Sequence, residues 1–523
     1  MSDTRAQRKN SDQIVSSSTT TLQNTTPTQT LSNDDDPYRH DDLNNKQSDE
    51  DNDILLVDWD GPDDPQNPKN WSKNRKWAAT LIVSSFTFVS PISSAMMAPS
   101  SEVIAREFHV TNSVITAMMT SMFVLGYAFG PLFLGPLSEI YGRTRVLQLS
   151  NLWYAAWNLG CGFAQDEKQL IVFRLMAGLG GSAPLSIGGG LLGDLWRPEE
   201  RGQALALYSL APILGPSLGP LAGAWVTERT TWRWVFWSTT IFDALIQILG
   251  LFFLQETFAP VVLERKAVRI RQGMDPEKSG HKEVRTVFDS ADRHWQNILK
   301  KALFRPWGFF IYEPIIQLLG IYIAFVYGLL YLYLTTIPGI FEGVYQQSTG
   351  IAGLHYLAFG IGLTGASQLN ARLMDRAYIY YTKKNGGQGR PEYRLLGMIP
   401  GTWILPIGLF ISGWTARADI HWIVPDIGMA FVAAGMILNY QCIQTYVIDA
   451  FTLHAASALA ATGFLRALCA FGFPLFAPTM YRVLGFGWGD TILAIFGIVV
   501  GCPAPYIFWK YGQRIRNASK YAA

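Results

Sequence analysis

The stretch GPLSEIYGRTR, residues 135–145, links two long runs of residues that carry no charge. Residues 114–134 before it and residues 146–165 after it contain no Asp, Glu, Lys or Arg. About 20 predominantly apolar residues are enough for a helix to cross a hydrocarbon layer roughly 30 Å thick. We therefore interpret the stretch as a short charged turn between two membrane-spanning helices.

Similar apolar runs recur along most of the chain. Hydrophobic residues make up 49% of the 523 residues and charged residues only 16%, a balance typical of membrane proteins. The runs predict an all-α membrane protein with twelve transmembrane helices. The predicted spans are centred near Phe88, Val124, Tyr154, Met176, Ile213, Phe242, Ile323, Phe359, Leu405, Val432, Ala470 and Phe496.

A polar and basic interruption at residues 255–308 separates six predicted spans from six. In the second half, ASQLNARLMDRAY (366–378) occupies the place of GPLSEIYGRTR, and both stretches put an acid near arginines at the end of a span. Many secondary transporters are built from two such six-helix bundles around a midplane site. We expect a tail at 1–76, pseudo-symmetric bundles at 77–254 and 309–512, a central loop at 255–308 and a second tail at 513–523.

The first 70 residues are rich in Ser, Thr, Asn, Gln and Asp, with 15 acidic residues against 6 basic ones. Such a segment has too few apolar groups to fold, so we predict that the tail is disordered. The predicted loops on the same side as this tail hold most of the Lys and Arg residues of the chain, a bias typical of the cytoplasmic side. Both termini are therefore expected in the cytoplasm.

A second stretch, LGPSLGPLAGAW (214–225), combines residues that weaken helices with a predicted span. Its glycines recur every four positions and therefore line one stripe of a helix, which lets a neighbouring helix approach closely. Its prolines each remove a backbone hydrogen bond and favour a bend. The stripe has either a conformational role or a merely structural one as a close-packed surface. The residues are Gly215, Pro216, Gly219, Pro220 and Gly223.

These stretches resemble motifs of the major facilitator superfamily, and within it the fungal drug:proton antiporters with twelve spans. The stripe resembles the antiporter motif of that family. GPLSEIYGRTR is similar to the family's loop motif at Gly135, Gly142, Arg143 and Arg145, with Glu139 where many members have Asp. FRLMAGLGGSAP (173–184) is similar to the motif of an arginine with glycines, at Arg174, Gly178 and Gly180.

The resemblance extends from about residue 70 to the end, through SPISSAMMAP, GDLWRPEERG, WRWVFW, ETFAP and RPEYRL. It implies a proton-coupled transporter in which Arg174 takes part in proton coupling.

Ionisable groups at membrane depth are costly and call for a partner or a purpose. Arg174 is either a coupling residue or part of a structural ion pair. Asp243 is either the proton carrier or a hydrogen-bonded structural acid. His355 either titrates near neutral pH or is satisfied within the core, and Arg466 is expected to anchor a carbonyl or an acid across the bundle.

Polar and aromatic residues in the seventh and tenth predicted spans are candidates for substrate binding. They are Tyr327, Tyr331, Asn439, Gln441 and Gln444, with Tyr333 as a further aromatic residue. Amphipathic walls of this kind suit bulky, mostly apolar molecules. The expected partners are a small amphipathic or apolar substrate, protons and the lipid bilayer, with no nucleic acid. We expect a monomer.

The sequence favours an exporter of drugs, toxins or secondary metabolites that works by alternating access in the plasma membrane. Two alternatives are an uptake symporter or facilitator for a nutrient or polyamine, and a non-transporting sensor on a transporter scaffold. The chain has no GxxxxGK[ST] loop for ATP and no HExxH motif, so we expect neither ATP-driven export nor an enzyme. The four cysteines have no metal-like spacing, and we expect no cofactor.

Overall fold

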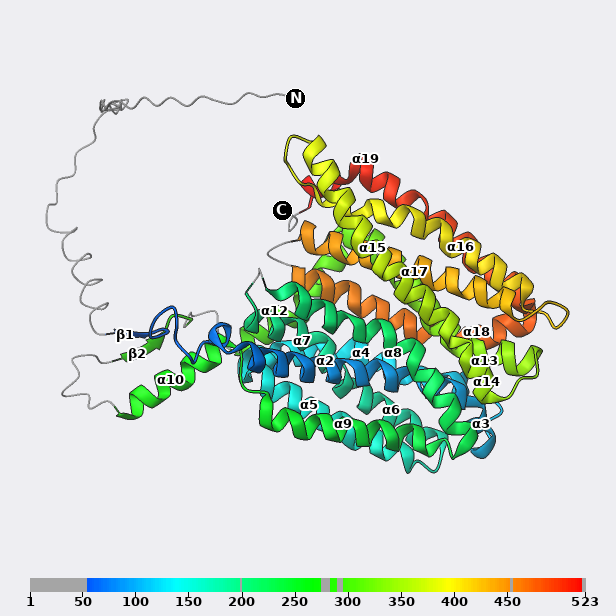
Figure 1. Cartoon of the computed structure of the whole chain (residues 1–523), viewed down its shortest axis with the longest axis horizontal. Coiled ribbons are helices and arrows are strands. Elements are labelled where there is room, and N and C mark those ends of the chain that lie inside the picture. Colours follow the sequence, from blue (N-terminus) through cyan, green and yellow to red (C-terminus); the bar gives the residue numbers. More distant parts are fainter. Residues whose placement is uncertain (1–53, 198–199, 274–282, 289–294, 452–454, 520–523) are drawn as a thin grey trace, which may run out of the picture.

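The computed structural model describes residues 54–197, 200–273, 283–288, 295–451 and 455–519. Its first half is a bundle of long helices joined by short turns (Figure 1). The helices are α2 (Lys73–Ala95), α3 (Ser101–Glu107), α4 (Ser113–Tyr141), α5 (Arg143–Gly162), α6 (Glu167–Gly181), α7 (Ala183–Leu195), α8 (Arg201–Arg229) and α9 (Arg233–Phe253). α6 and α7 follow each other closely and together form the fourth crossing.

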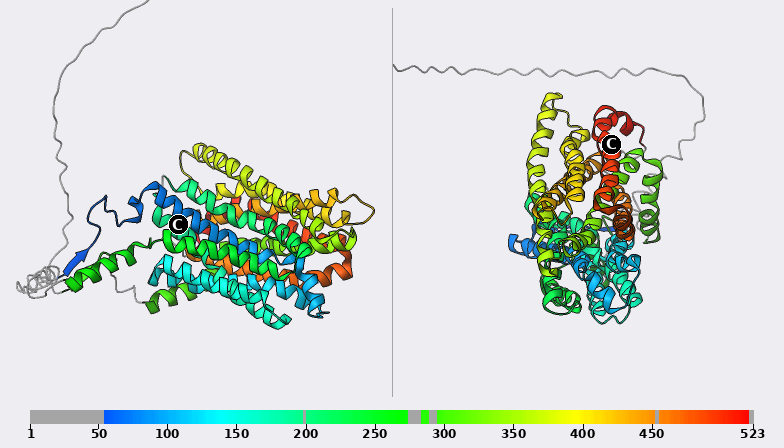
Figure 2. Two further views of the ribbon diagram at one scale, coloured as in Figure 1. Left: turned by 60° about the horizontal axis from the view of Figure 1, so that its bottom comes forward. Right: turned by 90° about the vertical axis from the view of Figure 1, so that its right-hand side faces the viewer.

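The second half repeats this plan. Its helices are α12 (Trp295–Tyr312), α13 (Pro314–Pro338), α14 (Thr349–Leu354), α15 (Tyr356–Lys384), α16 (Met398–Thr415), α17 (Ile423–Ala450), α18 (Ala455–Phe496) and α19 (Pro503–Asn517). The 3₁₀ helix η5 (Pro391–Gly397) precedes α16, and the π-helical turns η4 (Gly339–Val344) and η7 (Gly497–Gly501) follow α13 and α18. Figure 2 shows the two halves one above the other.

Nine helical stretches among the described residues are long and apolar enough to cross a membrane. The last of them, Ser457–Asn517, has 61 residues, so a straight helix would be about 90 Å long, far more than one crossing needs. Gly485 interrupts it at a φ of 73°, and the chain reverses there. The more polar helices α5 and α15 supply two further crossings, and the predicted twelve transmembrane helices are therefore confirmed.

The two halves contact each other along two pairs of helices. α4 packs against α18, where the ring of Phe129 lies 5.7 Å from that of Phe464. α8 packs against α14 and the beginning of α15. Figure 1 shows that α15 then diverges from α8 toward the end of the molecule that carries α10, so this pair is closed only at the end that carries α14.

The segments next to the bundle are more ordered than the sequence suggested. Strand β1 (Ile54–Val57) pairs in parallel with strand β2 (Glu283–Thr286), and both lie beside helix α10 (Ala259–Gly273). Parts of the predicted tail, at Ile54–Val57, and of the predicted central loop, at Ala259–Gly273 and Glu283–Thr286, therefore have regular structure. The reason is a small apolar core of Val57, Ala267 and Val284, which the acidic composition of the tail concealed. Residues 1–53 of the predicted tail lie outside the described residues.

Candidate transport site

The loop motif forms an ionic cluster at the end of the bundle that carries α10. Gly142 turns the chain between α4 and α5 at a φ of 101°, a conformation that favours glycine. The Arg143 guanidinium then forms an ion pair of 2.6 Å with Asp194 at the end of α7, and its backbone N–H donates to Glu256 after α9 over 2.9 Å. The cluster thus ties together the ends of four crossings.

The second half contains a matching cluster. Arg394, just before α16, forms ion pairs of 2.9 Å with Asp375 of α15 and 3.0 Å with Asp449 near the end of α17. Arg143 begins the third crossing of its half and Arg394 lies just before the third crossing of the other, while Asp194 and Asp449 both lie near the end of the fourth. The internal repeat suggested by the sequence therefore extends to the ion pairs.

The glycine stripe of α8 faces α2 of its own half. A Cβ atom built on Gly215 would lie 2.6 Å from Cβ of Pro91, and one on Gly219 would lie 2.7 Å from the carbonyl oxygen of Ile92. A Cβ on Gly223 would collide with the carbonyl of Met96. The stripe therefore lets α8 lie directly against the backbone of α2.

The opposite side of α8 contacts the other half. The Glu228 carboxylate accepts hydrogen bonds from the backbone N–H of Gly350 and the hydroxyl of Ser348 at the beginning of α14. Closer to the middle, a Cβ on Gly360 of α15 would meet the side chain of Ser217. α8 is consequently held between α2 and the helices α14 and α15.

Arg174 of α6 is fully buried, and backbone carbonyls accept four hydrogen bonds from it. It donates to Ser93 O and Ser94 O in the last turn of α2, over 2.9 and 3.0 Å, and to Met119 O and Thr120 O of α4, over 3.4 and 3.0 Å. The last carbonyls of a helix lack intrahelical partners and carry partial negative charge. These carbonyls, and no carboxylate among the described residues, compensate the Arg174 charge.

Asp243 is buried between α5 and α9. Asn151 donates to both of its carboxylate oxygens, over 2.8 and 3.0 Å. One turn away on α9, the hydroxyl of Thr239 accepts a hydrogen bond of 2.9 Å from Asn158. The Ser93 hydroxyl donates in turn to Asn158 over 3.1 Å. A polar path therefore runs from the carbonyls that bind Arg174 to the turn of α9 that precedes Asp243, without direct contact between Arg174 and Asp243.

A cluster of tyrosines and Arg466 lies on α13, α17 and α18. The guanidinium of Arg466 stands 4.6 Å from the ring centre of Tyr327 and donates a hydrogen bond of 2.6 Å to the hydroxyl of Tyr440. The ring centres of Tyr327 and Tyr331 are 5.6 Å apart. The hydroxyls of Tyr331 and Ser94 lie 3.0 Å apart, so the cluster reaches α2 of the first half.

A family model of the Major Facilitator Superfamily matches residues 83–474. The chain belongs to this superfamily. It is 45% identical to "Efflux pump vrtL" of Penicillium aethiopicum over 91% of this chain and 93% of that protein. It is 41% identical to "MFS-type transporter penM" of Penicillium rubens over 89% and 90%. The protein is thus a multi-pass membrane transporter and not an enzyme.

The fold of this transporter is also found in a solved structure. The xylose transporter XylE of E. coli, in a partially occluded inward open conformation, aligns with a TM-score of 0.62 over 84% of this chain and 98% of that chain. Their sequence identity is 17%, so the likeness concerns the fold alone. The predicted fold of two six-helix bundles is therefore confirmed.

The structure brings only some of the predicted substrate residues of the transporter together. Tyr327 and Tyr331 belong to the cluster around Arg466, and Gln444 lies one turn from Tyr440 on the same side of α17. Asn439 instead donates to the Gly435 carbonyl of its own helix. Gln441 bonds to Ser367 and Asn370 of α15. Asn439 and Gln441 therefore contribute to helix packing in this conformation.

The predicted motif residues also differ in their contacts. Glu139 and Arg145 are exposed, and a Cβ on Gly135 would meet nothing within 4 Å. Gly178 and Gly180 lie against the backbones of α4 and α5, respectively. Pro216 and Pro220 are buried within α8. In this conformation, Asp194 and Glu256 rather than Glu139 supply the carboxylates of the loop cluster.

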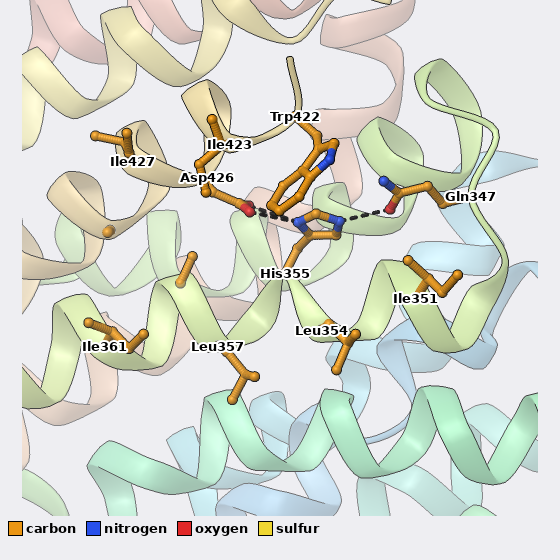
Figure 3. A pocket seen from close by; sticks show the side chains of 12 residues that line it. Gln347, Ile351, Leu354, His355, Leu357, Ile361, Trp422, Ile423, Asp426 and Ile427 are labelled. Carbon is orange, nitrogen blue, oxygen red and sulfur yellow. Dashed lines mark hydrogen bonds and ion pairs between the residues drawn. The ribbon is translucent and has the colours of Figure 1, made fainter.

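His355 is satisfied by two neighbours (Figure 3). Its Nδ1 lies 2.8 Å from a carboxylate oxygen of Asp426, and its Nε2 lies 2.7 Å from Oε1 of Gln347. The ring stacks on Phe341 with the ring centres 3.5 Å apart. A hollow of about 490 Å³ with mostly apolar walls adjoins this pair. It lies at the beginning of α17, near Ile423, roughly 25 Å along the helix from Tyr440.

Two buried carboxylates were not recognised in the sequence. Asp490 accepts hydrogen bonds from the hydroxyls of Tyr333, Tyr481 and Ser412, over 2.7, 2.6 and 3.0 Å. Asp426 is the partner of His355. An acid inside or beside a predicted span was the available signal at both positions. Asp194 and Glu256 were also missed as single residues, although both stretches that contain them were noted.

Proposed function

We propose that this transporter exports small amphipathic molecules, such as drugs, toxins or secondary metabolites, in exchange for protons. The observation that carries the proposal is the position of α8. Its glycine stripe lies against α2 and its opposite side holds α14 and α15 of the other half. A helix fixed so closely to one half can move with that half and open the contact with the other.

Three further observations support this proposal. The compared relative "Efflux pump vrtL" is an exporter by its name. Asp243 is a buried titratable group one helical turn from the end of a polar path that begins at the carbonyls bound by Arg174. The contact between α8 and α15 does not continue to the α10 end, as expected if the two halves separate and close at that end during transport. Arg174 and Asp243 are the proposed coupling residues.

The proposal includes a monomer in the plasma membrane with both termini in the cytoplasm. The bundles at 77–254 and 309–512 would then expose the central site to each side of the membrane in turn. The segments at 1–76, 255–308 and 513–523 would face the cytoplasm. Glycosylation tests the orientation, because the sequons at Asn24, Asn70 and Asn517 should never meet the glycosylation machinery. Asn70 donates to the carbonyls of Pro62 and Asp64. A mass shift on deglycosylation that maps to Asn70 would show that the proposed orientation is wrong.

Efflux with and without a proton gradient tests the function itself. Cells of a sensitive strain that express the chain should retain less of a toxic fluorescent substrate than control cells, and a protonophore should abolish the difference. Efflux that ignores the protonophore would favour a facilitator. Net accumulation driven by the gradient would favour an uptake symporter, and the absence of any flux across a broad panel would favour a sensor.

A further inference from the structure

Arg466 is partly buried and has far fewer hydrogen-bond partners than Arg174. A guanidinium has five N–H donors, and the hydrogen bond from Nη1 to Tyr440 is the one bond that the described residues accept from it. Its Nε is buried without an acceptor. No described carboxylate lies within ion-pair distance, whereas Arg174 is held by four carbonyls. The edge of the guanidinium formed by Nε and Nη2 therefore has no acceptor among the described residues, and Nε itself is buried in this conformation.

Aromatic rings surround the guanidinium. Tyr327 lies under the guanidinium, and its ring stacks near that of Tyr440, with centres 6.3 Å apart and planes inclined by 30°. Both tyrosines and Arg466 are only partly buried, while Tyr331 beside them is buried and contacts Ser94 of the first half. The charge of Arg466 thus lies among aromatic rings where the two halves meet, the region in which transporters of this architecture bind their cargo.

We propose that Arg466, Tyr327 and Tyr440 form a subsite for the carboxylate of an aromatic organic acid. This inference rests on the proposed transport function and names its substrate class. A carboxylate accepts two parallel hydrogen bonds from one edge of a guanidinium. The tyrosine rings offer offset stacking to the aromatic body of the same molecule. An anion at this place compensates a charge that is otherwise expensive at membrane depth.

A binding experiment on the purified full chain in nanodiscs tests the subsite with two matched probes, 2-naphthoate and its neutral analogue 2-naphthamide. The wild type should bind the acid at least tenfold more tightly than the amide. Arg466→Gln should remove this preference by lowering the affinity for 2-naphthoate without changing the affinity for 2-naphthamide. Arg466→Lys should restore it only in part, since an ammonium lacks the planar fork. Arg482→Gln is the matched control, because Arg482 lies on the same helix but is exposed and bonds to Ser113.

Equal affinity for both probes, no saturable binding of 2-naphthoate, or an unchanged preference in Arg466→Gln would each overturn the subsite. A monodisperse elution profile and a wild-type melting temperature for each variant exclude misfolding as the cause of a lost preference. Binding needs no gradient, so the subsite and the proposed function can fail separately. If 2-naphthoate binding depends on Arg466 but efflux is unaffected by a protonophore, the subsite stands and the proposed proton exchange is wrong.

Discussion

Arg174 and Arg466 are two interior arginines that differ in how many acceptors surround them. Arg174 joins the last turn of α2 to α4 through four carbonyl oxygens. Arg466 has one hydroxyl acceptor, from Tyr440. From the sequence we expected Arg174 to couple protons or to form an ion pair. The structure adds a third role, because Arg174 positions the last turn of α2 against α4. Carbonyl acceptors leave no trace in a sequence, because every residue has one.

We predict that Arg174→Ala lowers both transport and stability. The change leaves several buried carbonyls without donors, and each hydrogen bond to a charged group contributes about 1.5 to 3 kcal/mol. Arg174→Lys should recover part of both losses, because an ammonium still donates but cannot reach α2 and α4 with a planar fork. Thermal unfolding in detergent and efflux by cells measure the two effects. Wild-type stability in Arg174→Ala would contradict the structural part of this role.

Asp243→Asn separates the two roles still open for this residue. The variant keeps the shape and one acceptor for Asn151 but cannot take up a proton. If Asp243 carries the proton, gradient-driven efflux should fall to background while substrate binding and exchange down the substrate gradient persist. Efflux and equilibrium binding on the same preparation provide the comparison. Full gradient-driven efflux by this variant would show that Asp243 is only a structural acceptor.

At the scale of helices, α8 shows how small residues position a long element. The spacing of Gly215, Gly219 and Gly223 correctly predicted a stripe of close contact, but it did not identify the neighbouring helix. The structure assigns the stripe to α2 and gives the other side of α8 to α15. The choice depends on the packing of three helices around α8, and no local pattern contains that information.

Gly219→Leu should abolish transport while the protein still reaches the membrane. Even a Cβ atom at this position lies 2.7 Å from Ile92 O, and overpacking of this kind costs about 1 to 3 kcal/mol. Gly219→Ala should therefore impair transport as well, by a smaller amount. Gly202→Leu is the control, because a Cβ on this glycine at the start of the same helix meets nothing within 4 Å. Near-normal efflux by Gly219→Leu would show that transport does not depend on the glycine stripe.

At the scale of the whole molecule, the two halves repeat an ionic cluster at the same end. Arg143 pairs with Asp194 in the first half, and Arg394 pairs with Asp375 and Asp449 in the second. Apart from Asp375, which lies within α15, the paired residues are at or near helix ends, where the halves must separate and close in alternation. They are partly exposed, so their effect on overall stability should be small, and their main effect should be on the balance between conformations.

We expect Arg143→Ala and Arg394→Ala to lower the transport rate to a similar degree, by about tenfold, which corresponds to about 1.4 kcal/mol. Melting temperatures should change little. Arg376→Ala is the control, since Arg376 is exposed on the same helix as Asp375. Initial rates of efflux at equal surface expression provide the measurement. A large effect of one variant and none of the other would mean that the clusters are not equivalent.

The sequence by itself determined the transmembrane character, the twelve crossings, the division into two halves and most of the motif positions. These features depend on the length and spacing of apolar runs, because every membrane-spanning backbone must satisfy its own hydrogen bonds within a helix. Only the tertiary structure decided which helix the glycine stripe touches, that carbonyls hold Arg174, that Asp243 meets Asn151, and that one edge of Arg466 lacks an acceptor among tyrosines. Such contacts join residues from separate helices, and their geometry exists only after the helices have packed.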